Sequence, residues 1–361
     1  MLASPSVCRH ALALAMTAAM VVAAASGCAA GDRERNDSGV RVVPNLSQNR
    51  VDVFVDGKLF TAYIFPKSLK KPVLFPLNTA RGTPVTRGFP LAARSGERVD
   101  HPHHAGLWFN YGDVNGVDFW NNAVELKPEQ QAKMGTIIHR EVKRTSNGKN
   151  KGELQVVMDW LMPGEKTILR EETTFIFHSG ANLRGVDRIT KLTAQAERVS
   201  LKDNKEGTLG MRMTRELEHP SKEPLVFTDA SGKPTAVAKL DNTGVTGLYR
   251  SSEGKTGDAV WGTRGRWVTL EGRIGSEAVA VAILDHPRNP GYPTYWHARG
   301  YGLFAANPLG QKALSNGKDE LNFALEPGQS ATFRHRILII SGEVTPEKIE
   351  AFHRKFVEEV K

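Results

Sequence analysis

The sequence predicts an all-β protein, built as a large antiparallel β-sandwich with one helix near its C-terminal end. Many short segments alternate apolar and polar side chains, and turns that contain Gly or Pro separate these segments. Only the C-terminal residues show the 3.6-residue apolar period of an amphipathic helix. Strands that follow one another without intervening helices favour antiparallel pairing.

Four pairs of neighbouring strands are expected along the chain. In the first pair, residues 51–55 alternate in character, and Asp56 and Gly57 supply a two-residue turn before the apolar run 59–65. The other expected pairs are residues 154–162 with 167–177, 267–270 with 278–284, and 321–325 with 331–340.

The C-terminal helix is predicted from its start signal and its apolar face. Thr345 is a suitable N-cap and Pro346 fits the first turn. Ile349, Phe352 and Phe356 then recur at helical spacing, so one side of the helix is expected to pack against the sandwich.

The N-terminal residues resemble a bacterial export signal. A basic start is followed by the alanine-rich run 11–25 and by Ser26, Gly27 and Cys28, which resemble a lipobox with Cys28 as the lipidated residue. Cleavage near Ala25 without lipidation is the alternative. A lipoprotein would lie in the cell envelope, on the periplasmic face or the outer membrane, whereas ordinary cleavage would give a free periplasmic or secreted protein. Both readings predict export from the cytoplasm. The expected boundaries are a signal peptide at 1–27, a flexible tether at 28–40 and a single sandwich domain at 41–361.

Charge and cysteine usage limit the classes of partner. The formal net charge is +9, but acidic residues are interleaved with the basic ones and no basic run of the nucleic-acid-binding type occurs. The two cysteines are Cys8, inside the signal, and Cys28. Any metal would therefore be held by His, Asp or Glu, and the membrane would be contacted only through a lipid anchor.

Three imidazoles within four positions form the most distinctive motif. His101, His103 and His104 lie in the segment 100–108, beside aromatic residues. Because Pro102 excludes His101 from helical geometry, the three histidines are expected on an extended or turning segment, where His101 and His103 share one face and His104 points away. The functional interpretation is a catalytic or metal site, with His101 and His103 as the metal ligands; the alternative is a structural cluster.

Further candidate residues follow this motif. Trp108 and Trp120 are expected to stack on a sugar ring and Asp118 to accept its hydroxyl hydrogen bonds, whereas core packing is the alternative for each aromatic. The remaining candidates for substrate contact combine charged, imidazole and amide groups near expected strand ends: Lys205, Glu206, Arg212, His286, Asn289, His297, Arg299 and Asn307.

Several of these strings together resemble one bacterial family, which carries the label "methane oxygenase PmoA". The strings are residues 71–77, 82–87, 100–108, 113–120, 205–207 and 295–310. The chain departs from the family pattern at Ala105 and Gly300, where arginine and aspartate are expected. The resemblance implies a galactose-mutarotase-like sandwich, in which a sugar lies on the concave face of a sheet and His and Glu side chains move protons.

The leading hypothesis is an envelope-anchored enzyme that acts on a carbohydrate or modified sugar by proton transfer, as an epimerase, lyase or hydratase. In this hypothesis His103 or His104 is the acid and Glu206 is the base, while His101 and His297 orient the substrate or bind a divalent metal. One alternative is a non-catalytic surface lipoprotein that binds glycans. Another is a metal oxygenase that uses His101, His103 and Asp118.

Overall fold

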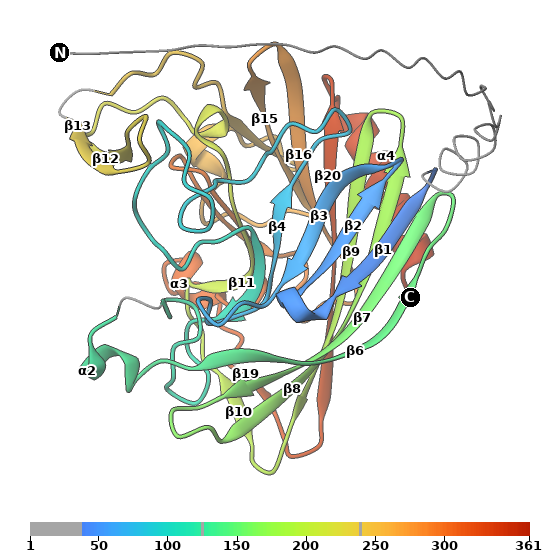
Figure 1. Cartoon of the computed structure of the whole chain (residues 1–361). Coiled ribbons are helices and arrows are strands. Elements are labelled where there is room, and N and C mark those ends of the chain that lie inside the picture. The colour runs from blue at the N-terminus through green and yellow to red at the C-terminus, as the bar shows by residue number, and fades with distance from the viewer. Residues whose placement is uncertain (1–37, 124–125, 238–239) are drawn as a thin grey trace, which may run out of the picture. The chain divides into compact units, whose positions relative to one another are not determined.

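Two eight-stranded antiparallel sheets make up most of the structure. The computed structural model describes residues 38–361 except 124–125 and 238–239, so the expected signal peptide and Cys28 lie outside the described residues. Sheet 1 has the order β1 (Val40–Asn45), β2 (Arg50–Val55), β3 (Lys58–Ile64), β4 (Val73–Leu77), β5 (Leu107–Tyr111), β11 (Gly207–Arg212), β18 (Leu303–Asn307) and β17 (Tyr295–Arg299). Sheet 2 has the order β14 (Leu248–Ser251), β15 (Trp267–Ile274), β16 (Glu277–Asp285), β20 (Ser330–Ser341), β9 (Leu183–Ala194), β8 (Thr167–Gly180), β7 (Lys151–Leu161) and β6 (Thr136–Ser146) (Figure 1).

Smaller elements complete the described part of the chain. Two further two-stranded antiparallel sheets are β10 (Val199–Leu201) with β19 (Phe323–Leu325), and β12 (Leu225–Thr228) with β13 (Pro234–Val237). The helices are α2 (Pro128–Gln131), α3 (Gln311–Leu314) and α4 (Pro346–Glu359), with single 3₁₀ turns at η1 (Leu46–Gln48), η2 (Arg215–Leu217) and η3 (Gly257–Val260). None of the helices in the described ranges has the length and apolar character needed to cross a membrane. The all-β prediction is confirmed.

Three of the four predicted strand pairs are confirmed. β2 pairs with β3 across Asp56 and Gly57, both of which have positive φ, as a type I′ turn requires. β7 pairs with β8, and β15 pairs with β16. The fourth pair was wrong, because β19 pairs with β10, while β20 lies between β9 and β16.

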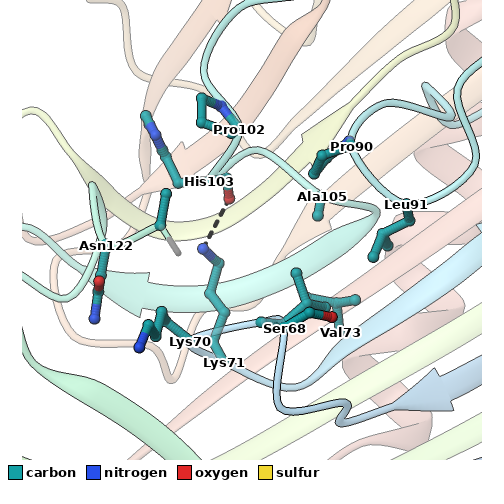
Figure 2. A pocket seen from close by; sticks show the side chains of 12 residues that line it. Ser68, Lys70, Lys71, Val73, Pro90, Leu91, Pro102, His103, Ala105 and Asn122 are labelled. Carbon is teal, nitrogen blue, oxygen red and sulfur yellow. Dashed lines mark hydrogen bonds between the residues drawn. The ribbon is translucent and has the colours of Figure 1, made fainter. Parts of the chain in front are cut away.

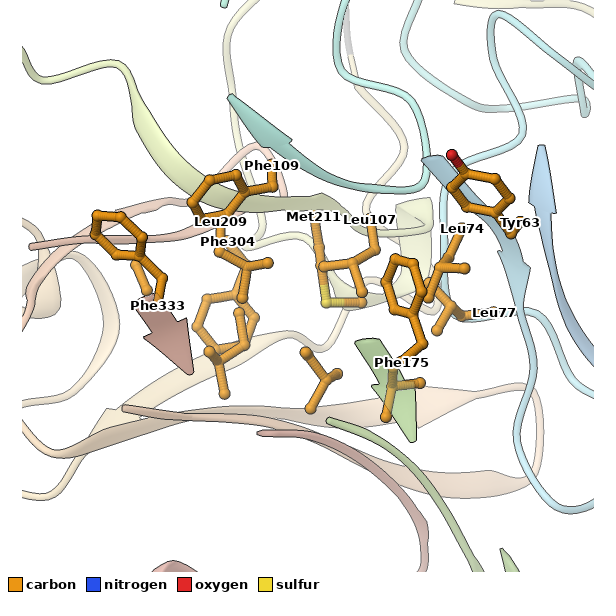
Figure 3. Packing of buried hydrophobic residues seen from close by; sticks show 14 of the residues in the cluster. Tyr63, Leu74, Leu77, Leu107, Phe109, Phe175, Leu209, Met211, Phe304 and Phe333 are labelled. Carbon is orange, nitrogen blue, oxygen red and sulfur yellow. The ribbon is translucent and has the colours of Figure 1, made fainter. Parts of the chain in front are cut away.

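The core lies between the two sheets. From sheet 1, alternate residues such as Phe109, Leu209 and Met211 point inward, where they meet Phe175 and Phe333 of sheet 2 (Figure 3). Because successive side chains of a strand point to opposite faces, the residues between them must lie on the outer face of sheet 1.

The predicted C-terminal helix is confirmed as α4. The Thr345 hydroxyl accepts a hydrogen bond from the backbone N of Lys348 at 3.3 Å, as an N-cap does. Ile349 and Phe356 pack with Trp267 and Leu338 of sheet 2. The helix therefore covers part of the outer face of sheet 2.

Candidate functional site

One row of outward residues crosses four adjacent strands of sheet 1. Trp108 of β5 lies opposite Gly210 of β11, Gly210 lies opposite Ala305 of β18, and Ala305 lies opposite His297 of β17. The two central positions are small. A Cβ atom on Gly210 would come within 2.5 Å of the Trp108 ring, so the glycine allows this ring to lie flat over the sheet.

Four aromatic rings form a continuous parallel stack beside this row. Tyr301 stacks on His101 at 5.4 Å between ring centroids, His101 on His104 at 4.8 Å, and His104 on Trp108 at 5.1 Å. The interplanar angles are 5°, 3° and 12°. Tyr301 belongs to the segment before β18, so the stack joins the early histidines to the late part of the chain.

The segment that carries the three histidines is a turn, and the prediction that His104 faces away from His101 was wrong. His101 has φ 43°, and the backbone N of His104 donates to the carbonyl of His101 at 2.9 Å. This turn brings His101 and His104 onto the same side. His103 contacts His104 edge-on, with ring centroids 4.3 Å apart.

A buried ion-pair network holds this turn on the sheet. Asp100 Oδ1 accepts hydrogen bonds from Arg87 at 2.6 Å and from Arg212 at 2.7 Å. Arg87 also donates to the backbone carbonyls of His101 and His104, at 3.0 and 3.1 Å. Burial raises the pKa of Asp100, but hydrogen bonding to His101 and the charges of Arg212 and Arg87 outweigh it and hold the pKa well below its usual range.

His104 is enclosed by neighbouring rings. Its side chain lies between His101 and Trp108, with the Trp120 ring edge-on at 5.6 Å. The Nε2 atoms of His103 and His104 are buried and have no hydrogen-bond partner among the described residues. Burial is the main cause that lowers the pKa of both imidazoles, to about 2 for His103. Both rings are therefore neutral, and the acid role predicted for them does not fit their surroundings.

His297 and Glu206 form the second half of the site. His297 Nδ1 lies 3.0 Å from the backbone carbonyl O of Lys205, which can only accept, so Nδ1 carries the hydrogen and Nε2 the lone pair. Glu206 Oε2 lies 3.8 Å from the same Nδ1, and Glu206 also forms an ion pair with the ammonium of Lys205. Burial is the main cause that lowers the pKa of His297, to about 3, with Lys205 and Arg299 adding to it.

The loop that carries Glu206 is positioned by Asn307. The Asn307 Nδ2 donates to the carbonyls of Asn204 and Lys205, at 2.8 and 3.0 Å, and its Oδ1 accepts from the backbone N of Gly310 at 2.9 Å. Asn307 is fully buried, so it positions the loop and does not contact a ligand, contrary to its predicted role.

The two halves of the site influence each other electrostatically. His101 is among the groups that lower the pKa of His297. Burial raises the pKa of Tyr301, the Arg212 and Arg299 charges oppose this rise, and the Glu206 carboxylate adds to it. The early and late histidines therefore share the outer face of sheet 1.

Several predicted contact residues serve other purposes. Trp108 and Trp120 have exposed fractions of 0% and 1%, so neither offers a ring face to a sugar. Asp118 accepts hydrogen bonds from the backbone N of Trp120 and Asn121 and from the Asn121 side chain, which holds a tight turn. The structural alternative therefore describes the two tryptophans better, because Trp120, in the loop after β5, packs edge-on against Trp108 within one buried cluster.

Two predicted residues lie away from this cluster. His286 follows β16 and contacts Phe356 of α4 edge-on. Asn289 donates to Asp285 and to the backbone carbonyl of Arg334, both at 2.7 Å. They sit near the strand ends of sheet 2, so the structure does not bring them to His101 and His297.

Sequence reasoning missed the residues that hold the site together. Arg87 and Tyr301 belong to the strings 82–87 and 295–310, but neither was given a role, because the sequence does not show that Arg87 binds Asp100 or that Tyr301 stacks on His101. Among the described residues, no three His, Cys, Asp or Glu side chains come together as a metal site. The proposed ligands His101 and His103 therefore have no third ligand of these types within the described ranges.

Replacing Gly210 with alanine is expected to lower the free energy of unfolding by about 1–3 kcal/mol, because the new methyl group displaces the Trp108 ring from the stack. Urea denaturation and near-ultraviolet circular dichroism measure both effects. Gly180→Ala is the matched control, since its nearest atom would lie at 3.3 Å. Equal stability and equal spectra for the two variants would contradict the packing described for Trp108.

Acid is expected to destabilise the protein through its buried neutral imidazoles. Burial lowers the pKa of His297 to about 3, whereas an unfolded chain has about 6.5. The unfolded state therefore binds more protons below pH 6.5, and this part of the stability is lost as the pH falls from about 6.5 towards 3. Urea midpoints at pH 7 and pH 4 test this, and a smaller difference is expected for His297→Asn. A wild-type midpoint that does not fall at pH 4 would argue against a neutral buried His297.

Comparisons with solved structures give low similarity over most of the chain. The galactose 1-epimerase from Lactobacillus acidophilus has 9% identity and a TM-score of 0.37, with 84% of this chain and 99% of that chain covered. A galactose mutarotase-like protein from Clostridium acetobutylicum has 11% identity and a TM-score of 0.33, with 85% and 100% covered. The galactosidase domain of an alpha-galactosidase-sucrose kinase has 7% identity and a TM-score of 0.43, with 83% of this chain but 42% of that chain covered. The chain thus spans less than half of that protein's length.

A comparison with curated proteins gave no match. One family model matches residues 50–354, and its description is a family of unknown function, DUF6807. The PmoA label is not supported by these comparisons. Since the model covers most of the chain, this protein belongs to the DUF6807 family.

Proposed function

We propose that this protein is an enzyme that transfers a proton on a carbohydrate, in a reaction of the epimerase, lyase or hydratase type. The observation that carries the proposal is the meeting of Glu206, His297 and His101 on the outer face of sheet 1. A carboxylate and an imidazole held at one place are the usual groups for general acid and base catalysis.

The geometry favours a different acid from the one that the sequence suggested, and it leaves the roles of Glu206 and His297 unchanged. Glu206 is the base, because its carboxylate is partly exposed and its loop is held by Asn307. His101 is the acid, since its side chain is 42% exposed whereas His104 is enclosed. His297 positions the substrate, because its Nε2 lone pair can accept a hydrogen bond from a sugar hydroxyl.

A carbohydrate fits the polar side chains around Glu206 and His297 on the outer face of sheet 1. The Lys205 ammonium is a hydrogen-bond donor and lies beside the Glu206 carboxylate, which is an acceptor. Neighbouring sugar hydroxyls can both donate and accept, so they can bind such a pair. Arg299 stands at the end of the same strand as His297 and rests on the Trp261 ring at 4.6 Å.

Hydrogen exchange with solvent tests the proposal. Mono- and disaccharides are incubated with the protein in D₂O, and NMR detects deuterium at ring carbons. The expected result is enzyme-dependent deuteration, or water addition or loss, at one carbon of at least one sugar. Sugar binding without any such change would favour the glycan-binding alternative, and absence of binding would contradict the carbohydrate class itself.

The envelope location is a further part of this proposal. It rests on the export signal and on Cys28 in the sequence. Metabolic labelling of cells that express the full-length protein with a radioactive fatty acid is expected to label the mature chain that begins at Cys28, and to fail for Cys28→Ser. Labelling that survives this substitution would contradict Cys28 as the lipidated residue.

A further inference from the structure

A cavity of about 230 Å³ lies beside the histidine turn, and it is distinct from the Glu206 and His297 site. Its walls are mostly apolar and include Val73, Leu91 and Ala105 (Figure 2). Lys71 and His103 also line it. An apolar cavity of about 150 Å³ accommodates benzene, so this one accommodates a ligand of about ten non-hydrogen atoms or fewer.

The Lys71 amine is buried at this cavity, and no described residue supplies it with a counter-ion. The side chain is 5% exposed, and its Nζ donates to the backbone carbonyl of His103 at 2.8 Å (Figure 2). No carboxylate of the described residues lies within 4.0 Å of Nζ, and the Trp108 ring centroid is 5.7 Å away. A lone buried ammonium is costly, so such an amine tends to lose its proton.

The electrostatics agree with this geometry. Burial lowers the pKa of Lys71 to about 7, although the charge of Asp118 opposes the effect. An amine that is neutral near physiological pH and faces an apolar cavity is an activated nucleophile. Neither packing nor an ion pair explains a lysine at this position, because a leucine would cover the same surface without the cost of burying a charge.

We propose that this cavity binds a small apolar aldehyde or ketone, and that Lys71 Nζ attacks the carbonyl carbon to form an imine. In the first step the N–C bond forms, the C=O π bond breaks, and a proton passes from nitrogen to oxygen to give a carbinolamine. In the second step the C–O bond breaks, the hydroxyl leaves as water with the hydrogen that remains on nitrogen, and the C=N bond forms, so no oxidant or reductant is needed. This proposal does not rest on the carbohydrate activity.

Reductive trapping tests it on the full-length protein. Benzaldehyde and sodium cyanoborohydride are added at pH 7, and peptide mapping by mass spectrometry follows benzylation of each lysine with time. Lys71 is expected to react at least about tenfold faster than the exposed Lys67, because at this pH an ordinary lysine is almost wholly protonated. Equal rates, or an unlabelled Lys71, would overturn the proposal.

A cavity-filling variant separates binding in the cavity from simple reactivity. Leu91→Trp places a larger side chain at the partly exposed wall. It is expected to slow Lys71 benzylation several-fold while Lys67 reacts as before, with circular dichroism confirming the fold. Glyceraldehyde, which is small but polar, is expected to label Lys71 with less preference over Lys67. Lys71 labelling that is unchanged in the variant and equal for both aldehydes would show that the cavity does not select the ligand.

Discussion

Replacing Asp100 with asparagine is expected to lower the free energy of unfolding by about 3 kcal/mol or more, because the substitution leaves two buried guanidinium groups without their shared carboxylate. Arg87 and Arg212 have exposed fractions of 1% and 0%, and both donate to Asp100. Their mutual repulsion, which Asp100 now offsets, would then act against the fold. Urea denaturation followed by circular dichroism measures the loss.

The control for this variant is an ion pair at the surface. Lys166 and Glu197 pair at 2.6 Å, but their side chains are 58% and 38% exposed. Glu197→Gln is therefore expected to cost less than about 1 kcal/mol. If Asp100→Asn cost no more than Glu197→Gln, the network could not be what holds the histidine turn on the sheet.

The pH dependence of the same network has a definite sign. The pKa of Asp100 is held below its usual value in the folded state, so its contribution is present above the unfolded pKa of about 4. It is lost as the pH falls below that value. Wild-type protein should therefore lose more stability than Asp100→Asn between pH 5 and pH 3.

Replacing Glu206 with glutamine is expected to slow proton transfer by about 10²- to 10⁴-fold, because the amide keeps the shape of the side chain but has no basic lone pair of comparable strength. The measured quantity is the rate of deuterium uptake, or of water addition or loss, by the sugar that reacts fastest in the D₂O panel. The affinity for that sugar should change much less. The substitution removes the charge of Glu206, but its ion pair partner Lys205 is exposed to solvent, so the loss of this pair should disturb the site little.

Two variants make the Glu206 result interpretable. Glu165→Gln removes an exposed carboxylate in the turn between β7 and β8, and its rate should equal that of the wild type. His297→Asn should weaken sugar binding as well as the rate, because His297 is assigned to positioning the substrate. A wild-type rate in Glu206→Gln would show that Glu206 is not the base.

The fold was predictable where neighbouring segments pair through a local turn. Asp56 and Gly57 encode the β2 and β3 hairpin, because their residue types suit positive φ at both turn positions. The partner of β19 was not predictable, since β10 lies more than one hundred residues earlier in the chain. Such pairings depend on which strands complete the sheets, and no local turn specifies that.

The site was predictable in its residue types but not in its exposure. His101 was identified from the cluster of three imidazoles, Glu206 from opposite charges next to each other on an expected turn, and His297 from its aromatic and cationic neighbours. Whether Trp108 faces solvent or the core depends on the loop after β5, which covers it only in the folded chain. Lys71 begins the string 71–77 but was given no role, because its burial arises from residues elsewhere in the chain, such as Leu91 and Ala105, that the sequence does not place beside it.

The central claim is that a sugar contacts His101 and His297 together, in one place on the outer face of sheet 1. Side-chain NMR of protein labelled with ¹⁵N-histidine tests it, with the most reactive sugar of the panel as the probe and single His→Asn variants to assign signals. The signals of His101 and His297 are expected to shift together with a common saturation curve, while that of His286 stays in place. Shifts confined to His286, or different affinities for His101 and His297, would contradict a single site.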